Sequence, residues 1–282
     1  MSDQNFVDLS GQVAIVTGAG RGLGRAFAIA LAGAGAHVVV TARSEPEVVA
    51  TGAEIRRLGG AATAIAADVT DRTAVAGLVA GIEQQVGPID LLVNNAGVAR
   101  ALGVMAEVDP DDWWREVEIN LRGPQLYMHA VLPAMIQRRR GRIINVASGA
   151  GLRGIEGMSA YGVSKTALIR LSETAALETQ AHGLAVFVIN PGTVLTPMVD
   201  YGMRSPEAGR RAPDVQAYFK DLYAKDAFDR IEDAAALVLL LASGQADALS
   251  GCYLSVRDDV PALIQQADAI QRDFTHRLRL RE

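Results

Sequence analysis

Cysteine and histidine are scarce in this 282-residue chain, and their positions exclude several kinds of site. Cys252 is the single cysteine, so no intramolecular disulfide can form, and its surroundings show no sign of nucleophilic activation. The four histidines, His37, His129, His182 and His276, are not paired with an acid or a nucleophile. No cluster of cysteine and histidine has metal-ligand spacing, so we expect no metal site.

Long hydrophobic runs and an excess of basic residues are also missing. The apolar run Ala234–Ala242 is far too short to cross a bilayer, and the polar residues Met1–Asn5 show no basic-then-apolar signal pattern. The net charge is −5, and the basic residues are scattered except at Arg138–Arg140 and the extreme C-terminus. We therefore expect a cytoplasmic protein that binds neither a membrane nor nucleic acid.

What the chain does contain is a regular alternation of short β-branched runs and longer helical patterns. The runs predict buried strands over Val13–Thr17, Val38–Thr41, Ala61–Ala66, Leu91–Asn94, Arg142–Val146, Ala185–Ile189 and Gly251–Val256. The other patterns predict helices over Leu23–Ala32, Pro46–Leu58, Arg72–Val86, Pro110–Arg139, Tyr161–Gln180 and Glu232–Leu241. This order is typical of an α/β fold, a Rossmann-type doubly wound parallel sheet of about seven strands with helices on both faces. No Pro/Ser-rich linker interrupts it, so we expect one domain over residues 1–282.

One region without a strand, residues 196–229, interrupts this alternation. Aromatic residues are embedded among its charges, at Tyr218, Phe219, Tyr223 and Phe228. Short mobile helices of this kind would form a lid over a substrate. The alternative is an ordinary helical excursion packed on the core.

A second irregular region is the C-terminal extension, residues 257–282. Its apolar residues Leu263, Ile264, Ala267 and Ile270 fall at helical spacing. Such a helix would either cover a neighbouring subunit or dock on its own chain, and the pattern alone does not separate the two.

A glycine-rich turn, Thr17-Gly18-Ala19-Gly20-Arg21-Gly22-Leu23-Gly24, follows the first predicted strand and opens the first predicted helix. Glycines let a main chain approach a pyrophosphate closely, and the exposed amides of a helix N-terminus face its negative charge. In this context the turn predicts a dinucleotide site.

Tyr161 and Lys165 lie one helical turn apart in Tyr161-Gly162-Val163-Ser164-Lys165. This spacing places the phenol and the ammonium group on the same helix face. A free tyrosine ionises near pH 10, so it needs a neighbouring cation to act as a base at neutral pH. The pair therefore indicates an acid–base site.

The glycine turn, with three residues between Gly18 and Gly22, and the Tyr161–Lys165 pair together resemble the short-chain dehydrogenase/reductase family. The resemblance extends from about Gly11 to about Val256. It implies a catalytic set in which Ser148 holds the substrate oxygen, Tyr161 exchanges the proton and Lys165 lowers the pKa of the phenol. It also implies that Asn120 interrupts the long helix and binds a water that continues the proton relay. Hydride would move between the carbinol carbon and nicotinamide C4.

The same resemblance implies a set of cofactor contacts. Asp68 and Val69 would contact the adenine ring, and Asn94-Asn95-Ala96-Gly97 would stabilise the central sheet and line the adenosine side. Pro191, Gly192, Val194 and Thr196 would hold the nicotinamide carboxamide. Lys165 would also contact the nicotinamide ribose. The expected cofactor residues are Gly18, Arg21, Gly22, Leu23, Arg43, Asp68, Val69, Asn95, Ala96, Gly97, Tyr161, Lys165, Pro191, Gly192, Val194 and Thr196.

The choice of nicotinamide depends on the end of the second predicted strand, where an acidic side chain would bind the ribose diol and repel a 2′-phosphate. That position is Ala42. Arg43 follows, and Arg21 lies inside the glycine turn, so two guanidinium groups could converge on a 2′-phosphate. We predict a preference for NADP(H), with NAD(H) left open. If Arg43 is solvated and Arg21 caps a neighbouring loop, the preference would be weak.

The substrate side is expected to be mostly apolar, lined by the lid and by Arg100, Leu102, Leu152, Arg153, Ile155 and Met158. This composition favours an uncharged hydrophobic or aromatic secondary alcohol and its ketone. Arg100 or Arg153 could instead anchor a carboxylate, or the phosphate of a carrier-linked acyl chain, so a 3-oxoacyl thioester reductase or 3-hydroxyacyl dehydrogenase is the alternative. Both arginines could also simply be solvated. A non-catalytic NADP(H) sensor and a dehydratase or epimerase are weaker alternatives.

In one respect the chain departs from the family, because it reads Val256-Arg257-Asp258-Asp259 where many relatives have a Val-Asp-Gly-Gly-like turn. Standard C-terminal packing is therefore in doubt. In the family the two long helices, here Pro110–Arg139 and Tyr161–Gln180, often pair across a two-fold axis, so we expect a homodimer or homotetramer. Trp113 and Trp114 could contribute to that face, although core packing would explain at least one of them equally well.

Overall fold

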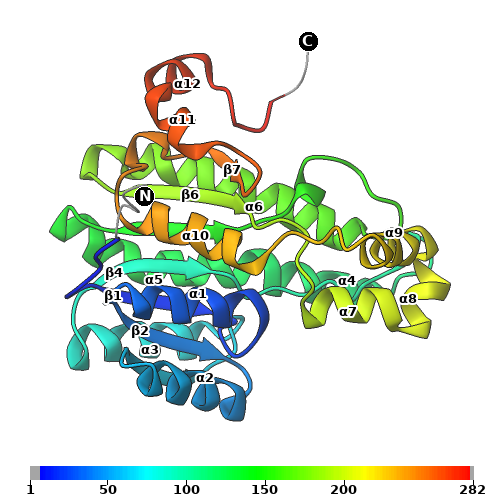
Figure 1. The fold of residues 1–282 in the computed structure, drawn as a ribbon, viewed down its shortest axis with the longest axis horizontal. Helices are drawn as coiled ribbons and strands as arrows, with labels where there is room; N and C mark the ends of the chain where they lie inside the picture. Colours follow the sequence, from blue (N-terminus) through cyan, green and yellow to red (C-terminus); the bar gives the residue numbers. More distant parts are fainter. Residues whose placement is uncertain (1–6, 280–282) are drawn as a thin grey trace.

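The computed structural model describes residues 7–279, so the predictions for Met1–Asn5 and for residues 280–282 lie outside it. Seven parallel strands form one sheet in the order β3-β2-β1-β4-β5-β6-β7 (Figure 1). The strands are β1 (Val13–Thr17), β2 (His37–Ala42), β3 (Ala61–Ala66), β4 (Ile89–Asn94), β5 (Arg142–Val146), β6 (Ala185–Asn190) and β7 (Tyr253–Ser255). The strand order reverses between β1 and β4, where open α/β sheets bind their ligands. The predicted fold class is confirmed.

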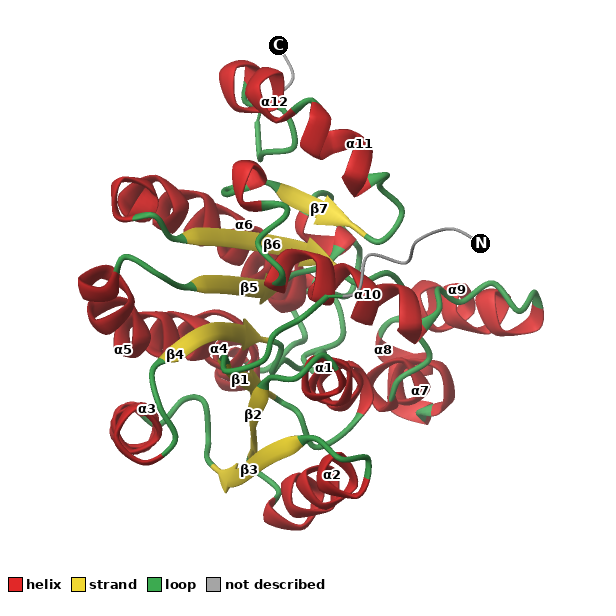
Figure 2. Ribbon diagram, turned by 60° about the vertical axis from the view of Figure 1, so that its left-hand side comes forward, coloured by secondary structure: helices red, strands yellow, loops and turns green. Residues whose placement is uncertain are grey.

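Helices cover both faces of the sheet (Figure 2). On one face lie α1 (Gly22–Gly33), α2 (Glu45–Arg57) and α10 (Ile231–Ala242). The other face is covered by α3 (Arg72–Gln85), α5 (Gly123–Arg138) and α6 (Ser159–Thr179). Along β1, Ala14 and Val16 belong to the first core, whereas Val13 and Ile15 belong to the second. Successive side chains of a strand point to opposite faces of the sheet, and here both faces are covered by helices. Every position of a central strand is therefore buried, which explains the nearly continuous apolar runs.

The helix predicted over Pro110–Arg139 begins at Pro110, ends at Arg138 and is interrupted between them. The segment forms α4 (Pro110–Val117), a π-helical turn η1 (Glu118–Arg122) and then α5. Both polar groups of the Asn120 side chain form hydrogen bonds with the main chain of Val98. These bonds stabilise the π-helical turn η1 in place of regular α-helix. The expected interruption at Asn120 is therefore confirmed. The described residues also contain three short 3₁₀ turns, η2 (Gly149–Gly151), η3 (Gln180–His182) and η4 (Asp247–Leu249).

Residues 196–229 fold as three short helices, α7 (Pro197–Arg204), α8 (Pro206–Arg211) and α9 (Pro213–Ala224). Each begins with a proline, a residue suited to the first turn because its missing N–H has no partner there. The three helices lie beyond the carboxyl ends of the strands and form the lobe at the right of Figures 1 and 2. Ala208, Ala212 and Val215 are buried against Leu102 and Met158.

The C-terminal extension folds back on its own chain. It contains α11 (Val260–Gln265) and α12 (Ala267–Asp273), and Val260, Ala267 and Ile270 join the core beside α10. Beyond α12, the carbonyl of His276 accepts a hydrogen bond of 2.7 Å from the Tyr253 N–H at the edge of β7. Of the two arrangements left open by the sequence, docking on its own chain is the one observed. Within residues 7–279 no helix combines the length and the apolar character needed to span a bilayer.

Candidate active site

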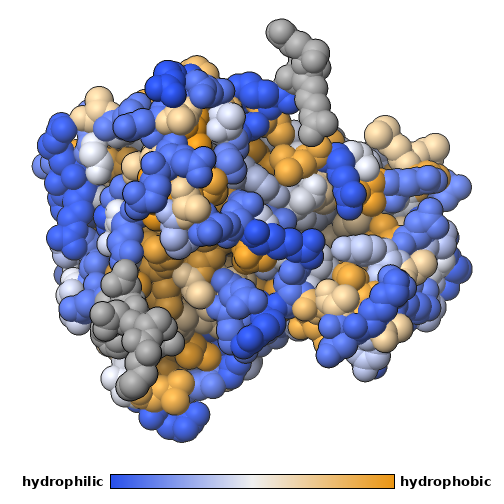
Figure 3. Space-filling view, turned by 45° about the horizontal axis from the view of Figure 1, so that its top comes forward, coloured by the Kyte–Doolittle hydropathy of each residue, from blue (hydrophilic) through white to orange (hydrophobic). Residues whose placement is uncertain are grey.

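A cleft of about 860 Å³ lies at the carboxyl ends of the strands. Its lining includes every residue expected to contact the cofactor, from the glycine turn to Thr196. The α7–α9 lobe bounds its outer side and stands apart from the body of the molecule at the right of Figure 3. The described residues contain no group of histidine, cysteine and acidic side chains arranged to hold a metal ion.

The glycine turn packs so closely against the end of β4 that side chains would not fit. A Cβ atom on Gly18 would lie 2.8 Å from the Cα of Ala96, and Gly18 has a φ of +64°. A Cβ on Gly24 would lie 2.3 Å from the carbonyl oxygen of Gly18. Asn95 fixes this contact, since its Nδ2 donates to the carbonyl of Thr17 over 2.9 Å. The bare main chain and the N-terminus of α1 form a cradle that fits a pyrophosphate.

The adenosine side is bordered by Asp68 and two arginines. The Asp68 carboxylate accepts from the N–H and hydroxyl of Thr70 at 2.9 and 2.7 Å. Burial raises the pKa of Asp68, but these two hydrogen bonds and the nearby arginines outweigh it and leave that pKa below its usual value. Arg43 and Arg21 both line the cleft, and the Arg21 guanidinium lies 3.3 Å from the Glu47 carboxylate. Both arginines therefore border the same cleft, and Arg21 is paired with an acid there.

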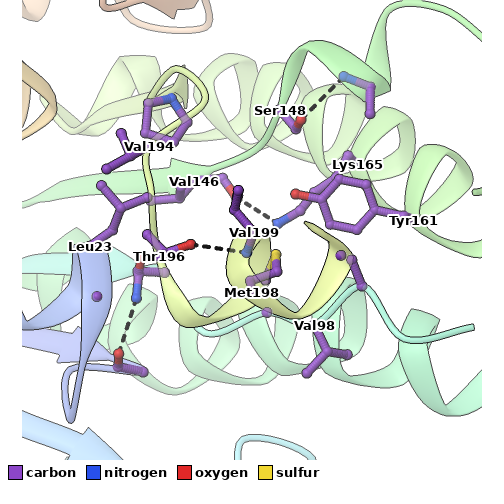
Figure 4. A pocket seen from close by; sticks show the side chains of 18 of the residues that line it. Leu23, Val98, Val146, Ser148, Tyr161, Lys165, Val194, Thr196, Met198 and Val199 are labelled. Carbon is purple, nitrogen blue, oxygen red and sulfur yellow. Dashed lines mark hydrogen bonds between the residues drawn. The ribbon is translucent and has the colours of Figure 1, made fainter. Parts of the chain in front are cut away.

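The Pro191-Gly192 segment is held by an acid that the sequence did not indicate. Asp229 accepts from the Thr193 N–H over 2.7 Å and forms an ion pair with Arg257 at 2.9 Å. Arg257 is one of the three residues, with Asp258 and Asp259, that depart from the family's usual turn, and it holds Asp229 in place. Figure 4 shows Thr196 accepting a 3.4 Å bond from the Val199 N–H at the start of α7.

Ser148, Tyr161 and Lys165 come together in the cleft (Figure 4). The Lys165 ammonium donates to the Val146 carbonyl over 2.8 Å and lies 5.6 Å from the centroid of the Tyr161 ring. The Ser148 hydroxyl accepts from the Ala150 N–H over 3.2 Å. Ser148, just after β5, and Tyr161 and Lys165, in the first turns of α6, thus direct a hydroxyl, a phenol and an ammonium group into the same part of the cleft.

Burial controls the protonation of this group. It raises the pKa of Tyr161 to about 12, and a hydrogen bond with Ser148 opposes this rise. Burial also lowers the pKa of Lys165 to about 8, although the negative charge of Glu116 opposes that change. At neutral pH Tyr161 is therefore a neutral phenol beside a mostly charged ammonium group. This arrangement can donate a proton to an oxygen held between Ser148 and Tyr161.

Asn120 is fully buried and does not line the cleft. Its Oδ1 accepts from the Val98 N–H, and its Nδ2 donates to the Val98 carbonyl, both over 2.8 Å. Nδ2 also lies 3.1 Å from the Ser164 hydroxyl. The side chain is thus committed to positioning the segment after β4 against α6. Asn94 acts similarly in the sheet, donating over 2.8 Å to Asn145 on β5.

On the substrate side, five of the six expected residues line the cleft: Arg100, Leu102, Arg153, Ile155 and Met158. Leu152 does not, and this prediction was wrong. The 3₁₀ turn η2 ends just before it, and the Leu152 side chain is 52% exposed. Tyr218 and Phe219 of the 196–229 region line the cleft as well, whereas Tyr223 is exposed. The sequence did not single out the lining residues Met198, Val199, Gly202 and Val215 of the same region.

A buried acid behind the cleft, Glu116 on α4, was also missed. Its carboxylate accepts hydrogen bonds from the N–H groups of Arg100 and Ala101, the latter over 2.9 Å. Burial raises the pKa of Glu116, while these two hydrogen bonds and Lys165 oppose the rise. In the sequence Glu116 is one of several charged residues on a short helix, and no local pattern marks it as buried.

The two adjacent tryptophans have different environments. Trp113 packs with the buried residues Ala101, Val108 and Ala160, and its Nε1 donates to the Ser159 hydroxyl over 3.0 Å. Trp114 is 61% exposed. Core packing therefore accounts for Trp113 alone.

Comparison with known proteins identifies relatives of the whole fold. A family model described as short chain dehydrogenase matches residues 12–205. A Xanthobacter autotrophicus protein named inactive 2-(S)-hydroxypropyl-CoM dehydrogenase 2 is 35% identical over 206 residues, or 73% of this chain and 88% of that protein. The 3-oxoacyl-acyl-carrier-protein reductase FabG of Thermotoga maritima is 30% identical over 248 residues, 88% of this chain and 97% of its own. A solved structure, a variant of actinorhodin polyketide ketoreductase with NADPH, has a TM-score of 0.79 at 31% identity, covering 87% of this chain and 95% of that one.

The family model spans more than half of the chain, and its match agrees with the order of the sheet and the residues gathered in the cleft. The chain therefore belongs to the short-chain dehydrogenase/reductase family, whose members use NAD(P)(H), and is an oxidoreductase that acts on an alcohol or ketone.

Proposed function

We propose that the protein interconverts a secondary alcohol and a ketone on a hydrophobic or aromatic small molecule, using NADP(H). The observation that supports this most strongly is the meeting of Ser148, Tyr161 and Lys165 in a cleft whose outer part is mostly apolar. Leu102, Met158 and Phe219 pack around the Tyr161 side of that cleft. Apolar walls would bind the hydrophobic part of a substrate and leave its oxygen for Ser148 and Tyr161.

In the direction of reduction, the Ser148 hydroxyl would donate a hydrogen bond to the carbonyl oxygen. Tyr161 would transfer its proton to the same oxygen as the alcohol forms, and Lys165 would stabilise the resulting phenolate. When bound, the nicotinamide supplies the hydride, which goes to the carbonyl carbon. Asn120 would support this group by positioning Val98. Because its side chain is already bonded, a relay water at Asn120 would have to contact the main-chain carbonyl.

The preference for NADP(H) rests mainly on Arg43. The Arg43 side chain lines the cleft directly after β2, whose last residue is Ala42 and not an acid that would repel a 2′-phosphate. Arg21 would join it by releasing Glu47, an exposed pair that contributes little stability. The related polyketide ketoreductase was solved with NADPH, which agrees with this assignment. NAD(H) would bind the same glycine turn without the contact between Arg43 and a 2′-phosphate.

A 3-oxoacyl thioester is the second candidate substrate, and the similarity to the Thermotoga maritima reductase favours it. The non-catalytic sensor is disfavoured because Ser148, Tyr161 and Lys165 all face the cleft. The name of the Xanthobacter relative shows that family membership alone does not guarantee activity, so catalysis has to be measured.

We also propose that the chain folds as one cytoplasmic domain, that residues 196–229 act as its lid, and that it assembles as a homodimer or homotetramer through α4, α5 and α6. Trp114 on α4 and Val163 and Leu177 on α6 are exposed apolar side chains that a second subunit could cover.

The test is a fluorescence titration with NADPH and NADH, followed by turnover on a panel of aromatic, steroid and 3-oxoacyl ketones. Tyr161→Phe removes the transferable proton and should lower kcat by about 10²- to 10⁴-fold while NADPH still binds. Tight NADPH binding without turnover on the whole panel would contradict the proposal and support the sensor.

A further inference from the structure

Arg100 has an unusual environment among the residues of the substrate side. Its guanidinium carbon lies 3.4 Å from the centroid of the Tyr201 ring. Tyr201 belongs to α7, and its ring packs in the same apolar cluster as Tyr161, Leu102 and Met158. The charge of Arg100 is therefore placed beside the apolar space that adjoins the proton donor.

Stacking on a ring uses only the face of a guanidinium group. The five N–H donors lie in the plane of the group, so a stacked arginine keeps its edges available for hydrogen bonds. A carboxylate or a phosphate can accept two of these bonds at once. The Tyr201 ring thus fixes the orientation of Arg100 without consuming its donors.

Both sides of this stack are held by further contacts. Glu116 accepts hydrogen bonds from the main-chain N–H groups of Arg100 and Ala101, which fixes the segment that carries the arginine. The Tyr201 hydroxyl donates to Glu207 over 2.9 Å, which fixes the ring. Such pre-organisation lowers the entropy cost of binding a ligand.

Two arginines of the α7–α9 lobe already have acidic partners. Arg204 pairs with Asp200 at 2.6 Å, and Arg211 pairs with Glu207 at 3.4 Å. Within residues 7–279, Arg100 forms no ion pair with an acidic side chain, although it lines the cleft. An arginine that is stacked, positioned and without a counter-ion is suited to bind an anion that arrives with the substrate.

We propose that Arg100 binds an oxyanion, a carboxylate or a phosphate, at the end of the substrate remote from the reacting carbon. This inference rests on the proposed function and refines its substrate class. The substrate would combine a ketone or secondary alcohol, an apolar middle held by Leu102, Met158 and Phe219, and an anionic end at Arg100.

The first experiment measures binding, so that it does not depend on turnover. Benzoate and benzamide are titrated into NADPH-saturated enzyme, which keeps the small anion out of the cofactor's phosphate sites. Benzoate should bind more tightly than benzamide, and Arg100→Gln should weaken benzoate binding about 10- to 100-fold without changing that of benzamide. Equal binding of the two compounds, no binding of either, or an unchanged affinity in Arg100→Gln would overturn the proposal.

Matched variants separate Arg100 from general charge effects. Arg204→Gln removes one arginine charge from α7, the helix that carries Tyr201, at a position outside the cleft, and should leave benzoate binding unchanged. Tyr201→Leu removes the stacked ring and should weaken benzoate binding severalfold, whereas Tyr201→Phe should retain it. A larger loss in Arg153→Gln than in Arg100→Gln would assign the anion to Arg153 instead and contradict the proposal.

Two further experiments are needed. One identifies the source of the anion, and the other separates a failure of the anion site from a failure of the proposed redox function. Acetoacetyl-CoA and acetoacetyl-N-acetylcysteamine are compared as competitors of benzoate. A CoA-specific advantage that Arg100→Gln abolishes identifies a carrier phosphate, and its absence identifies a carboxylate on a small molecule. Tyr161→Phe should lose turnover but keep benzoate binding, so loss of the redox reaction and loss of the anion site are seen separately.

Discussion

The cofactor half and the substrate half of the cleft differ in composition: main chain forms most of the first, and side chains form most of the second. The half that faces the glycine turn consists largely of main chain at the ends of β1 and β4, with Gly18 and Gly24 packed against neighbouring backbone. The other half consists of side chains, chiefly where Ala212 and Val215 of the 196–229 region pack on Leu102 and Met158. Main chain held by a seven-stranded sheet is rigid and tolerates little change. Packing between side chains on short helices is adjustable, which suits recognition of one substrate among many.

The largest effect is expected from Gly24→Val in the rigid half. The new side chain would begin 2.3 Å from the Gly18 carbonyl oxygen, so the turn would have to open and lose its shape. NADPH binding should fall by more than about 100-fold. The matched control is Gly33→Ala in the same helix, where a Cβ meets no atom within 4 Å and binding should be unchanged. Normal NADPH affinity in Gly24→Val would show that close main-chain packing is not needed.

The next prediction concerns pH, because the acid–base group lies at the border of the two halves. Lys165 is charged below its pKa of about 8 and neutral above it, whereas Tyr161, with a pKa of about 12, stays protonated. If the charged form is required, kcat for ketone reduction should be constant below pH 7 and fall about tenfold per pH unit above the Lys165 pKa. A profile measured from pH 6 to 10 that stays flat to pH 9.5 would contradict this role of Lys165.

A smaller effect is expected from Arg43→Gln, which tests a side chain in the rigid half. Loss of a charge-assisted contact should raise the Kd for NADPH by about tenfold or more and leave that for NADH unchanged. Parallel fluorescence titrations with the two cofactors measure this. An equal change for both would mean that Arg43 does not contact a 2′-phosphate.

The smallest effect is expected from Val215→Ala in the adjustable half. The substitution removes two methyl groups that are buried against Leu102 and Met158, which should loosen α9 and cost about 1 kcal/mol of stability. KM for the best ketone should rise severalfold with an unchanged Kd for NADPH. If NADPH binding weakens to the same extent, the two halves are not independent.

These two halves also differed in how far the sequence predicted them. The glycine turn was recognisable from its own residues, and the segments around Asp68, Asn95 and Pro191 from their resemblance to short contiguous motifs of the family. Their meeting in one cleft follows from the parallel sheet, which brings the carboxyl ends of its strands to one edge. Asn120 was expected to interrupt a helix, and η1 confirms this.

The errors and omissions arose where a contact joins distant segments. Leu152 was expected in the cleft, but the direction of its side chain depends on the 3₁₀ turn before it. Arg21 lines the cleft as expected, but its pairing with Glu47 depends on how α2 packs against the glycine turn. Glu116 and Asp229 were not recognised, since each acts by accepting N–H groups from loops 15 and 36 residues away.

The sequence by itself determined the order of strands and helices, the glycine cradle and the identity of the acid–base residues, because these depend on periodicity and on residues close in the chain. Only the tertiary structure decided which side chains of residues 196–229 enter the substrate half, where the C-terminal extension docks, and that Arg100 stacks on Tyr201. These features depend on the packing of surfaces that are far apart in sequence, and the pattern of a single segment carries no information about its distant partner.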